Sequence, residues 1–181
     1  LAPYFLATEV YLKQKKYKKM AQMLNLAEKR NPNLSLENPF ILGETPVTTI
    51  KQGVEAYREQ EWMSIYNLSI DLKEKQNLQK AVDKMETAIL LHPKRIESYS
   101  TLAMWEFENN NLEQAIINVD RGLAMDMDNS NLCQLKADLL LEQDSTDTYS
   151  STMQNVIQLY EKSIKYSEKP GSIMRKLLHV Y

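Results

Sequence analysis

The chain has little of what breaks or cross-links a helical protein. Glycine occurs only four times in 181 residues, and a single cysteine, Cys133, leaves no pair for an internal disulfide. Leu, Lys, Glu, Gln, Met and Ala dominate, and these residues lose little side-chain freedom in a helix. With 43% hydrophobic and 25% charged residues, the composition predicts a soluble, folded protein that is mainly helical.

No apolar run approaches the ~20 residues that a membrane-spanning helix needs. No signal peptide is recognisable, and the sequence starts at Leu1 inside a helical pattern. The compartment therefore stays open. We expect a cytoplasmic protein or, if a targeting segment preceding Leu1 has been removed, an exported or periplasmic one.

A basic excess is also missing. The net charge is −2 and the pI is about 5.8, which argues against a dedicated nucleic-acid binder. The charge is uneven, however, with a net of +5 over residues 1–34 and −6 over residues 96–181. This asymmetry could steer partners or let chains stack head to tail. Two differently charged solvated faces are the favoured interpretation.

A period of 34 residues is the strongest pattern in the sequence. In residues 62–95 it is carried by Ile65, Leu68, Ser69, Leu72, the turn Gln76-Asn77, Leu78, Ala81, Met85, Ala88 and Pro93. In residues 96–129 it recurs as Tyr99, Leu102, Ala103, Asn110-Asn111, Leu112, Ala115, Val119, Gly122 and Met127. Small residues at fixed places predict close helix crossings, with large residues filling the space beside them.

Three further stretches carry the pattern less completely. Residues 1–34 hold Tyr4, Ala7, Thr8, Tyr11, Tyr17, Met20, Leu24, Ala27 and Pro32 in the matching places. Residues 130–169 form another copy, with a lengthened polar loop at 144–152. Residues 170–181 begin one more first helix. We expect all copies to belong to one solenoid domain.

These places resemble the tetratricopeptide repeat (TPR) family over about residues 1–34 and 62–181. The resemblance implies an all-α, right-handed α-solenoid of antiparallel helix pairs. It also implies protein binding, since members of the family bind many unrelated partners. The sequence departs from the family pattern at Ser69, where Gly is usual, and at Met127, where Pro is usual.

Residues 35–61 do not fit the repeat and form an insertion. The stretch Leu34–Thr45 predicts a loop or a short extended segment. Thr45-Pro46 predicts a helix start, and apolar spacing then predicts one overlong helix over about 46–75, whose second half opens the repeat at 62–95. Its first half packs either on a partner or a second copy, or back on residues 1–34. The second alternative is favoured, because the first pair needs a neighbour for its exposed side.

The TPR resemblance implies that the first helices line a concave binding face. The places on that face that we expect to bind a partner are Phe5, Met63, Tyr66, Ile70, Met104 and Phe107. Members that capture chaperone carboxyl tails use Lys and Asn at such places, so that clamp is absent here. The apolar strip predicts an amphipathic helix or an extended apolar peptide as ligand. The alternative, equally weighted, is that the strip is covered within the molecule.

Residues suited to catalysis are scarce. The two histidines, His92 and His179, are far apart in sequence and have no neighbours at metal-ligand spacing; His92 is expected at a solvent edge. Cys133 occupies a core place and is expected to be buried and inert. No Gly-rich phosphate loop or nucleophile motif occurs. We therefore expect neither an enzyme nor a cofactor, metal or small-molecule substrate.

The segment 13–19 carries five lysines and is the sharpest charge feature. It could contact acidic protein, anionic lipid or RNA. A solvated turn between the first two helices is favoured, with Tyr17 as its packing residue.

Three hypotheses for function remain. The first is a protein–protein interaction scaffold or adaptor that binds a peptide, helix or subunit on its apolar, aromatic face. The second is a self-assembling, homo-oligomeric repeat protein. The third is a non-catalytic regulatory segment of a larger enzyme or complex.

Overall fold

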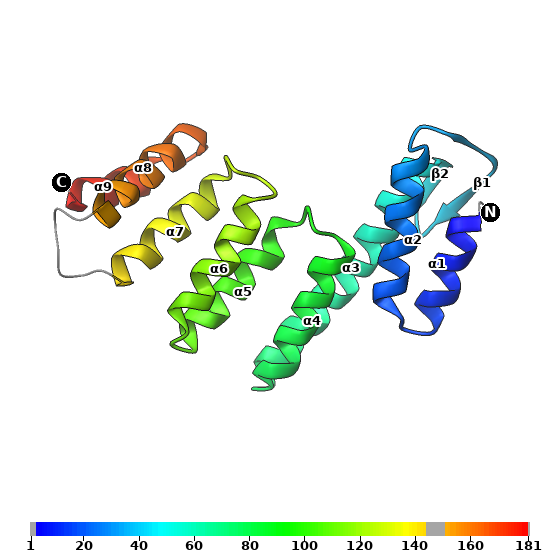
Figure 1. Ribbon diagram of the computed structural model, residues 1–181, viewed down its shortest axis with the longest axis horizontal. Coiled ribbons are helices and arrows are strands. Elements are labelled where there is room, and N and C mark those ends of the chain that lie inside the picture. Colours follow the sequence, from blue (N-terminus) through cyan, green and yellow to red (C-terminus); the bar gives the residue numbers. More distant parts are fainter. Residues whose placement is uncertain (1–2, 144–150, 181) are drawn as a thin grey trace. The chain divides into compact units, whose positions relative to one another are not determined.

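The computed structural model describes residues 3–143 and 151–180, most of which lie in helices (Figure 1). The chain divides into two compact units, residues 1–93 and residues 94–181. Helix pairs dominate both units, which confirms the predicted helical repeat fold. That all pairs belong to one solenoid domain stays a prediction. None of the described helices combines the length and the apolar character needed to cross a bilayer.

The first unit contains α1 (Pro3–Lys13), α2 (Tyr17–Arg30), β1 (Ser35–Leu42), β2 (Thr45–Thr49), α3 (Ile50–Glu74) and α4 (Leu78–Leu91). The second contains α5 (Ile96–Glu108), α6 (Leu112–Leu123), α7 (Ser130–Gln143), α8 (Ser151–Tyr166) and α9 (Gly171–Val180). Helices α1 and α2, α3 and α4, α5 and α6, and α7 and α8 pack as pairs, and α9 packs on α8. Residues 144–150 of the predicted lengthened loop lie outside the described part.

The turns inside the first three pairs have one geometry. Lys15, Gln76 and Asn110 are the only described non-glycine residues with positive φ, at 54°, 58° and 61°. In each turn the next N–H donates to a carbonyl five residues back, at 2.8–2.9 Å. This hydrogen bond closes the C-terminus of the first helix in the manner of a Schellman motif. A lysine, a glutamine and an asparagine take the left-handed position in these three turns.

The small residues of the pattern are buried where the helices cross. Thr8, Ser69, Ala103 and Ala137 occupy the first helices, and Ala27, Ala88, Gly122 and Ser163 the second. A Cβ on Gly122 would lie 2.6 Å from Leu132 Cδ1, so helix α7 packs directly against the glycine. The predicted packing of small residues at crossings is therefore confirmed.

The first part of the insertion forms a β-hairpin, so of the two alternatives predicted for Leu34–Thr45 the extended segment is confirmed and the loop is wrong. Strands β1 and β2 are antiparallel, and a two-residue turn joins them, with Gly43 at φ 60°. The buried side chain of Val47 lies opposite Phe40 across the strands. Val47 is buried and Phe40 is half-buried against the Phe5 ring, whereas Ile41 and Pro46 are exposed, so one side of the hairpin packs on the helices.

The long helix starts later than predicted. It begins at Ile50 rather than Pro46 and ends at Glu74, so its 25 residues span about 37 Å at 1.5 Å per residue. Thr49 is its N-cap: the Thr49 hydroxyl accepts from the Gln52 N–H at 3.3 Å, and Gln52 Oε1 accepts from the Thr49 N–H at 3.2 Å. This capping box fixes the start of the helix. Pro46 lies in β2 instead, opposite Ile41.

The first half of α3 packs back on the first helix pair. Phe5 of α1 stacks on Tyr57 with ring centroids 5.6 Å apart, and its ring covers Gly53, where a Cβ would lie only 2.3 Å from Phe5 Cζ. The Tyr57 hydroxyl donates to Glu9 Oε1 at 2.8 Å. This confirms the favoured alternative, in which the insertion gives the first pair its neighbour.

Candidate functional site

Five of the six residues predicted to bind a partner have solvent-accessible side chains, and Phe5 does not. Phe5 is fully buried between Tyr57, Gly53 and Phe40, whose ring centroid lies 5.7 Å away. Its place on a binding strip is therefore corrected: Phe5 is a core residue that holds α1 and the hairpin onto α3.

Three of the predicted residues share one side of α3 in the first unit. Met63, Tyr66 and Ile70 follow one another at helical spacing, and we call them the α3 face. Met63 is 50% exposed, while Tyr66 and Ile70 are half-buried. The Tyr66 ring lies 5.2 Å from the buried Trp62 ring, which holds it in place. The α3 face is thus an accessible apolar surface on a supported helix.

Two predicted residues lie together on α5 in the second unit. Met104 and Phe107, which we call the α5 face, are 45% and 39% exposed. Trp105, between them in sequence, is buried and anchors the helix. Exposed carboxylates at Glu97 and Glu108 lie toward the two ends of α5. The predicted strip therefore becomes two surfaces, one in each unit.

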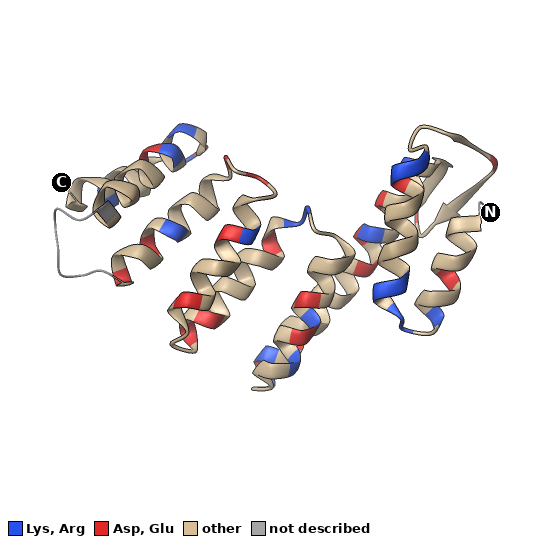
Figure 2. Cartoon of the chain, viewed as in Figure 1, with Lys and Arg blue, Asp and Glu red and all other residues tan. Residues whose placement is uncertain are grey.

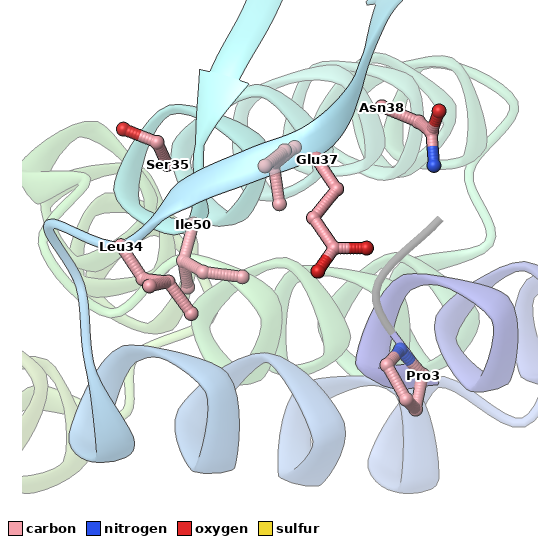
Figure 3. Close-up of a pocket in the computed structure, with 7 residues that line it drawn as sticks. Pro3, Leu34, Ser35, Glu37, Asn38 and Ile50 are labelled. Atoms are coloured by element: carbon pink, nitrogen blue, oxygen red, sulfur yellow. The ribbon is translucent and has the colours of Figure 1, made fainter.

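A cavity that the sequence did not indicate lies beside β1 in the first unit (Figure 3). Its volume is about 380 Å³. It is lined by Pro3, Leu34, Ser35, Leu36, Glu37, Asn38 and Ile50. Glu37 of β1 points toward Pro3 at the start of α1. Glu37 is the single ionisable side chain of this lining, so the cavity offers no pair of groups for acid–base chemistry.

A second cavity, also about 380 Å³, lies between α7, α8 and α9. Asp138 is its polar centre. It accepts from the Tyr160 hydroxyl at 2.6 Å and from Lys176 Nζ at 2.6 Å, with Leu141 and Val180 among the apolar lining residues. Burial and the bond to Asp138 raise the pKa of Tyr160 well above its ordinary value. These bonds occupy both Asp138 oxygens and tie the three helices together.

Two further groups considered for chemistry are buried. Cys133 is buried as expected, and burial raises the pKa of its thiol, which keeps it protonated and unreactive. His92 was expected at a solvent edge and is instead 3% exposed. Its Nε2 lies 3.3 Å from Glu55 Oε1 and 3.6 Å from Glu59 Oε2, so α3 covers it. Among the described residues no cluster of three metal-ligating side chains occurs.

Glu61 supplies a pH-dependent prediction. Its side chain on α3 is only 8% exposed, and burial raises the pKa of its carboxyl. The pKa of Glu61 is therefore higher in the folded state than in the unfolded state. The protonated carboxyl is compatible with the fold at pH below the unfolded-state pKa, and its ionisation destabilises the fold as pH rises through the folded-state pKa. At pH 7 Glu61→Gln should therefore stabilise the fold by on the order of 1 kcal/mol.

Thermal or urea unfolding at several pH values measures that difference. It should shrink toward zero near pH 4, where Glu61 is protonated as well. Glu74→Gln, an exposed change on the same helix, should leave stability within about 0.5 kcal/mol at every pH. A destabilised Glu61→Gln variant at pH 7 would contradict the prediction.

No protein-family model matches the chain, and no curated protein matches its sequence. Solved structures do resemble its fold. The first TPR domain of Spaghetti (RPAP3), bound to an HSP90 peptide, superposes with a TM-score of 0.56 at 9% identity, over 67% of this chain and 93% of that one. The Yersinia enterocolitica type III secretion chaperone SycD, in complex with a peptide of the translocator YopD, gives 0.54 at 12%, over 67% and 89%. PcrH from Pseudomonas aeruginosa gives 0.53 at 11%, over 67% and 89%. At these identities the likeness establishes the fold.

Proposed function

Because the chain has the fold of tetratricopeptide repeat proteins, we propose that it is a non-catalytic binding module that holds a peptide or helix of another protein on the exposed apolar side of a first helix, at the α3 face or at the α5 face. The observation that carries this proposal is the exposure of large apolar side chains, Met63, Met104 and Phe107, on first helices of the repeat. The buried side chains of Trp62 and Trp105 anchor α3 and α5 beneath these residues. A partner that covers the exposed apolar side chains removes their surface from water, which favours binding.

The side chains suit an apolar peptide. Methionine adapts its shape to irregular partners, and tyrosine and phenylalanine contribute large contact area with few rotatable bonds. Two of the similar structures were solved with a peptide bound, which supports the peptide as the class of ligand. Neither face carries a lysine or arginine of its own, so a carboxyl-terminal clamp is not part of the proposal.

Selection of a phage-displayed random peptide library against the whole chain tests the proposal. We expect enriched peptides with two or more large apolar residues. Met63→Ser with Tyr66→Ser should weaken the peptides that bind the α3 face about ten-fold or more, which is ~1.4 kcal/mol. Met104→Ser with Phe107→Ser should do the same for the peptides that bind the α5 face.

Two matched controls separate binding from general loss of surface hydrophobicity. Leu90→Ser on α4 and Ile117→Ser on α6 each remove a residue that is 43% exposed on a second helix. They should change affinity by less than about two-fold. The proposal fails if no peptide is enriched, or if the controls weaken binding as much as the changes on the α3 and α5 faces.

A further inference from the structure

The first helix pair presents an outer surface that is cationic. Its exposed basic residues lie on the turn between α1 and α2 and at both ends of α2 (Figure 2). They are Lys13, Lys15, Lys16, Lys18, Lys19, Lys29 and Arg30, which we call the basic surface. Such a concentration of one sign creates a potential that attracts acidic partners.

The acids of this pair are too few to offset those cations. The pair contains two carboxylates, Glu9 and Glu28, and both are engaged with α3. Glu9 accepts from the Tyr57 hydroxyl at 2.8 Å, and Glu28 accepts from Arg58 at 3.1 Å. Both carboxylates are thus bonded to groups of α3, and the seven cations of the basic surface remain in excess.

The start of α2 adds to the positive potential. Helix α2 has no acidic residue in its first turn and no side-chain hydrogen bond at its N-cap, Lys16. Lys18 and Lys19 follow at the end of the helix where the macrodipole disfavours cations. The positive end of the α2 macrodipole therefore repels these two lysines, and a bound anionic group would offset that repulsion.

Aliphatic side chains interrupt the charge on the same two helices. Leu6 and Val10 of α1 are each 50% exposed, and Leu26 of α2 is 46% exposed. Leu26 lies on the same side of α2 as Lys18 and Lys29. A plain polyanion would leave these side chains in water. We propose that the basic surface docks an acidic amphipathic segment of another protein, whose carboxylates meet the lysines while its aliphatic residues cover Leu26 and its neighbours.

The aromatic residues of this pair favour protein over nucleic acid or membrane. Among residues 3–30 no aromatic side chain is fully exposed, and Lys19 Nζ lies 5.7 Å over the Tyr11 ring. Base stacking and anchoring at a membrane interface both use exposed aromatic rings. The proposal does not depend on the α3 or α5 face.

Fluorescence anisotropy with a labelled helical peptide of about 18 residues, made of Glu, Leu and Ala with Leu on one side, tests the proposal on the whole chain. We expect binding at about 50 mM NaCl that weakens steeply by about 500 mM. The same peptide with Ser in place of Leu should bind at least about five-fold more weakly. The triple variant Lys16→Glu, Lys18→Glu, Lys29→Glu should bind at least about ten-fold more weakly.

The matched control is Lys51→Glu, Lys75→Glu, Lys80→Glu, which makes the same charge change on exposed residues of α3, its C-cap and α4. It should keep more than about half of the affinity, and circular dichroism should show that both triple variants fold with the helix content of the wild type. Equal weakening in the two variants overturns the proposal. Tighter binding of poly-uridine RNA or of phosphatidylserine vesicles than of the peptide overturns it too. The proposal is also overturned if the peptide does not bind and light scattering shows that the wild-type chain self-associates while the basic-surface variant is a monomer of 21.1 kDa.

Discussion

Phe5→Ala is expected to lower the free energy of unfolding of the first unit by about 3–5 kcal/mol. The Phe5 ring is fully buried, stacks on Tyr57 and packs against Gly53 with no room for a methyl group between them. Its removal leaves a cavity where α1, α3 and the hairpin meet, and Gly53 has no side chain to fill it. Urea unfolding followed by circular dichroism measures the loss.

The neighbouring Leu6 provides the control. It is 50% exposed on the same helix, and Leu6→Ala should cost less than about 1 kcal/mol. Tyr57→Phe distinguishes ring packing from hydrogen bonding, because it keeps the stack and removes only the bond to Glu9. A Phe5→Ala variant as stable as Leu6→Ala would mean that Phe5 is a surface residue, as its place in the repeat predicted.

The misplacement of Phe5 shows which features the repeat determines. The exposure of Met63, Met104 and Phe107 follows from the period of a helix packed on its own partner, which is local information. Phe5 occupies in α1 the place that Tyr66 occupies in α3, but the hairpin and the extra turns of α3 cover it. A 34-residue period cannot indicate a contact made by residues that lie outside the period.

The hairpin was missed although its signals are present. Gly43-Glu44 separates two stretches with β-branched or aromatic residues, which is the spacing of a two-residue hairpin turn. Thr49 and Gln52 carry the capping-box pattern three residues apart. Thr45-Pro46 imitates a helix start equally well by sequence alone. The contact of the paired strands with the Phe5 ring, through Phe40, favours the hairpin over a helix start at Thr45-Pro46. That contact joins residues far apart in sequence, so the local pattern does not reveal it.

His92 was misjudged for a related reason. In the repeat pattern it stands beside Pro93 in a closing turn, where solvent is the usual neighbour. The first half of α3 extends past that turn and brings Glu55 and Glu59 to the ring of His92, while Trp62 lies edge-on at 6.5 Å. Insertions therefore change the environment of residues that belong to the regular repeat.

Arg58 joins three helices at the same junction, and Arg58→Ala should cost about 3 kcal/mol or more of unfolding free energy. The guanidinium is 5% exposed and donates to Asn25 Oδ1 at 2.6 Å, to Glu28 Oε2 at 3.1 Å and to the Leu91 carbonyl at 2.9 Å. Leu91 ends α4, which has no basic residue in its last turn. Arg58 thus satisfies an orphan carbonyl at the negative end of the α4 dipole, and its loss leaves that buried group without its partner.

Graded replacements at this site separate the contributions by urea unfolding. Arg58→Lys keeps the charge but cannot reach three acceptors with a planar fork, so it should recover less than about half of the loss. Glu28→Gln should cost less than about 1 kcal/mol, because the Glu28 side chain is 42% exposed and its ion pair is screened by water. If Glu28→Gln costs as much as Arg58→Ala, the ion pair and not the carbonyl contact stabilises the junction. If Arg58→Lys equals wild type, a single charge at this position is sufficient, and the three-way bridge contributes nothing beyond it.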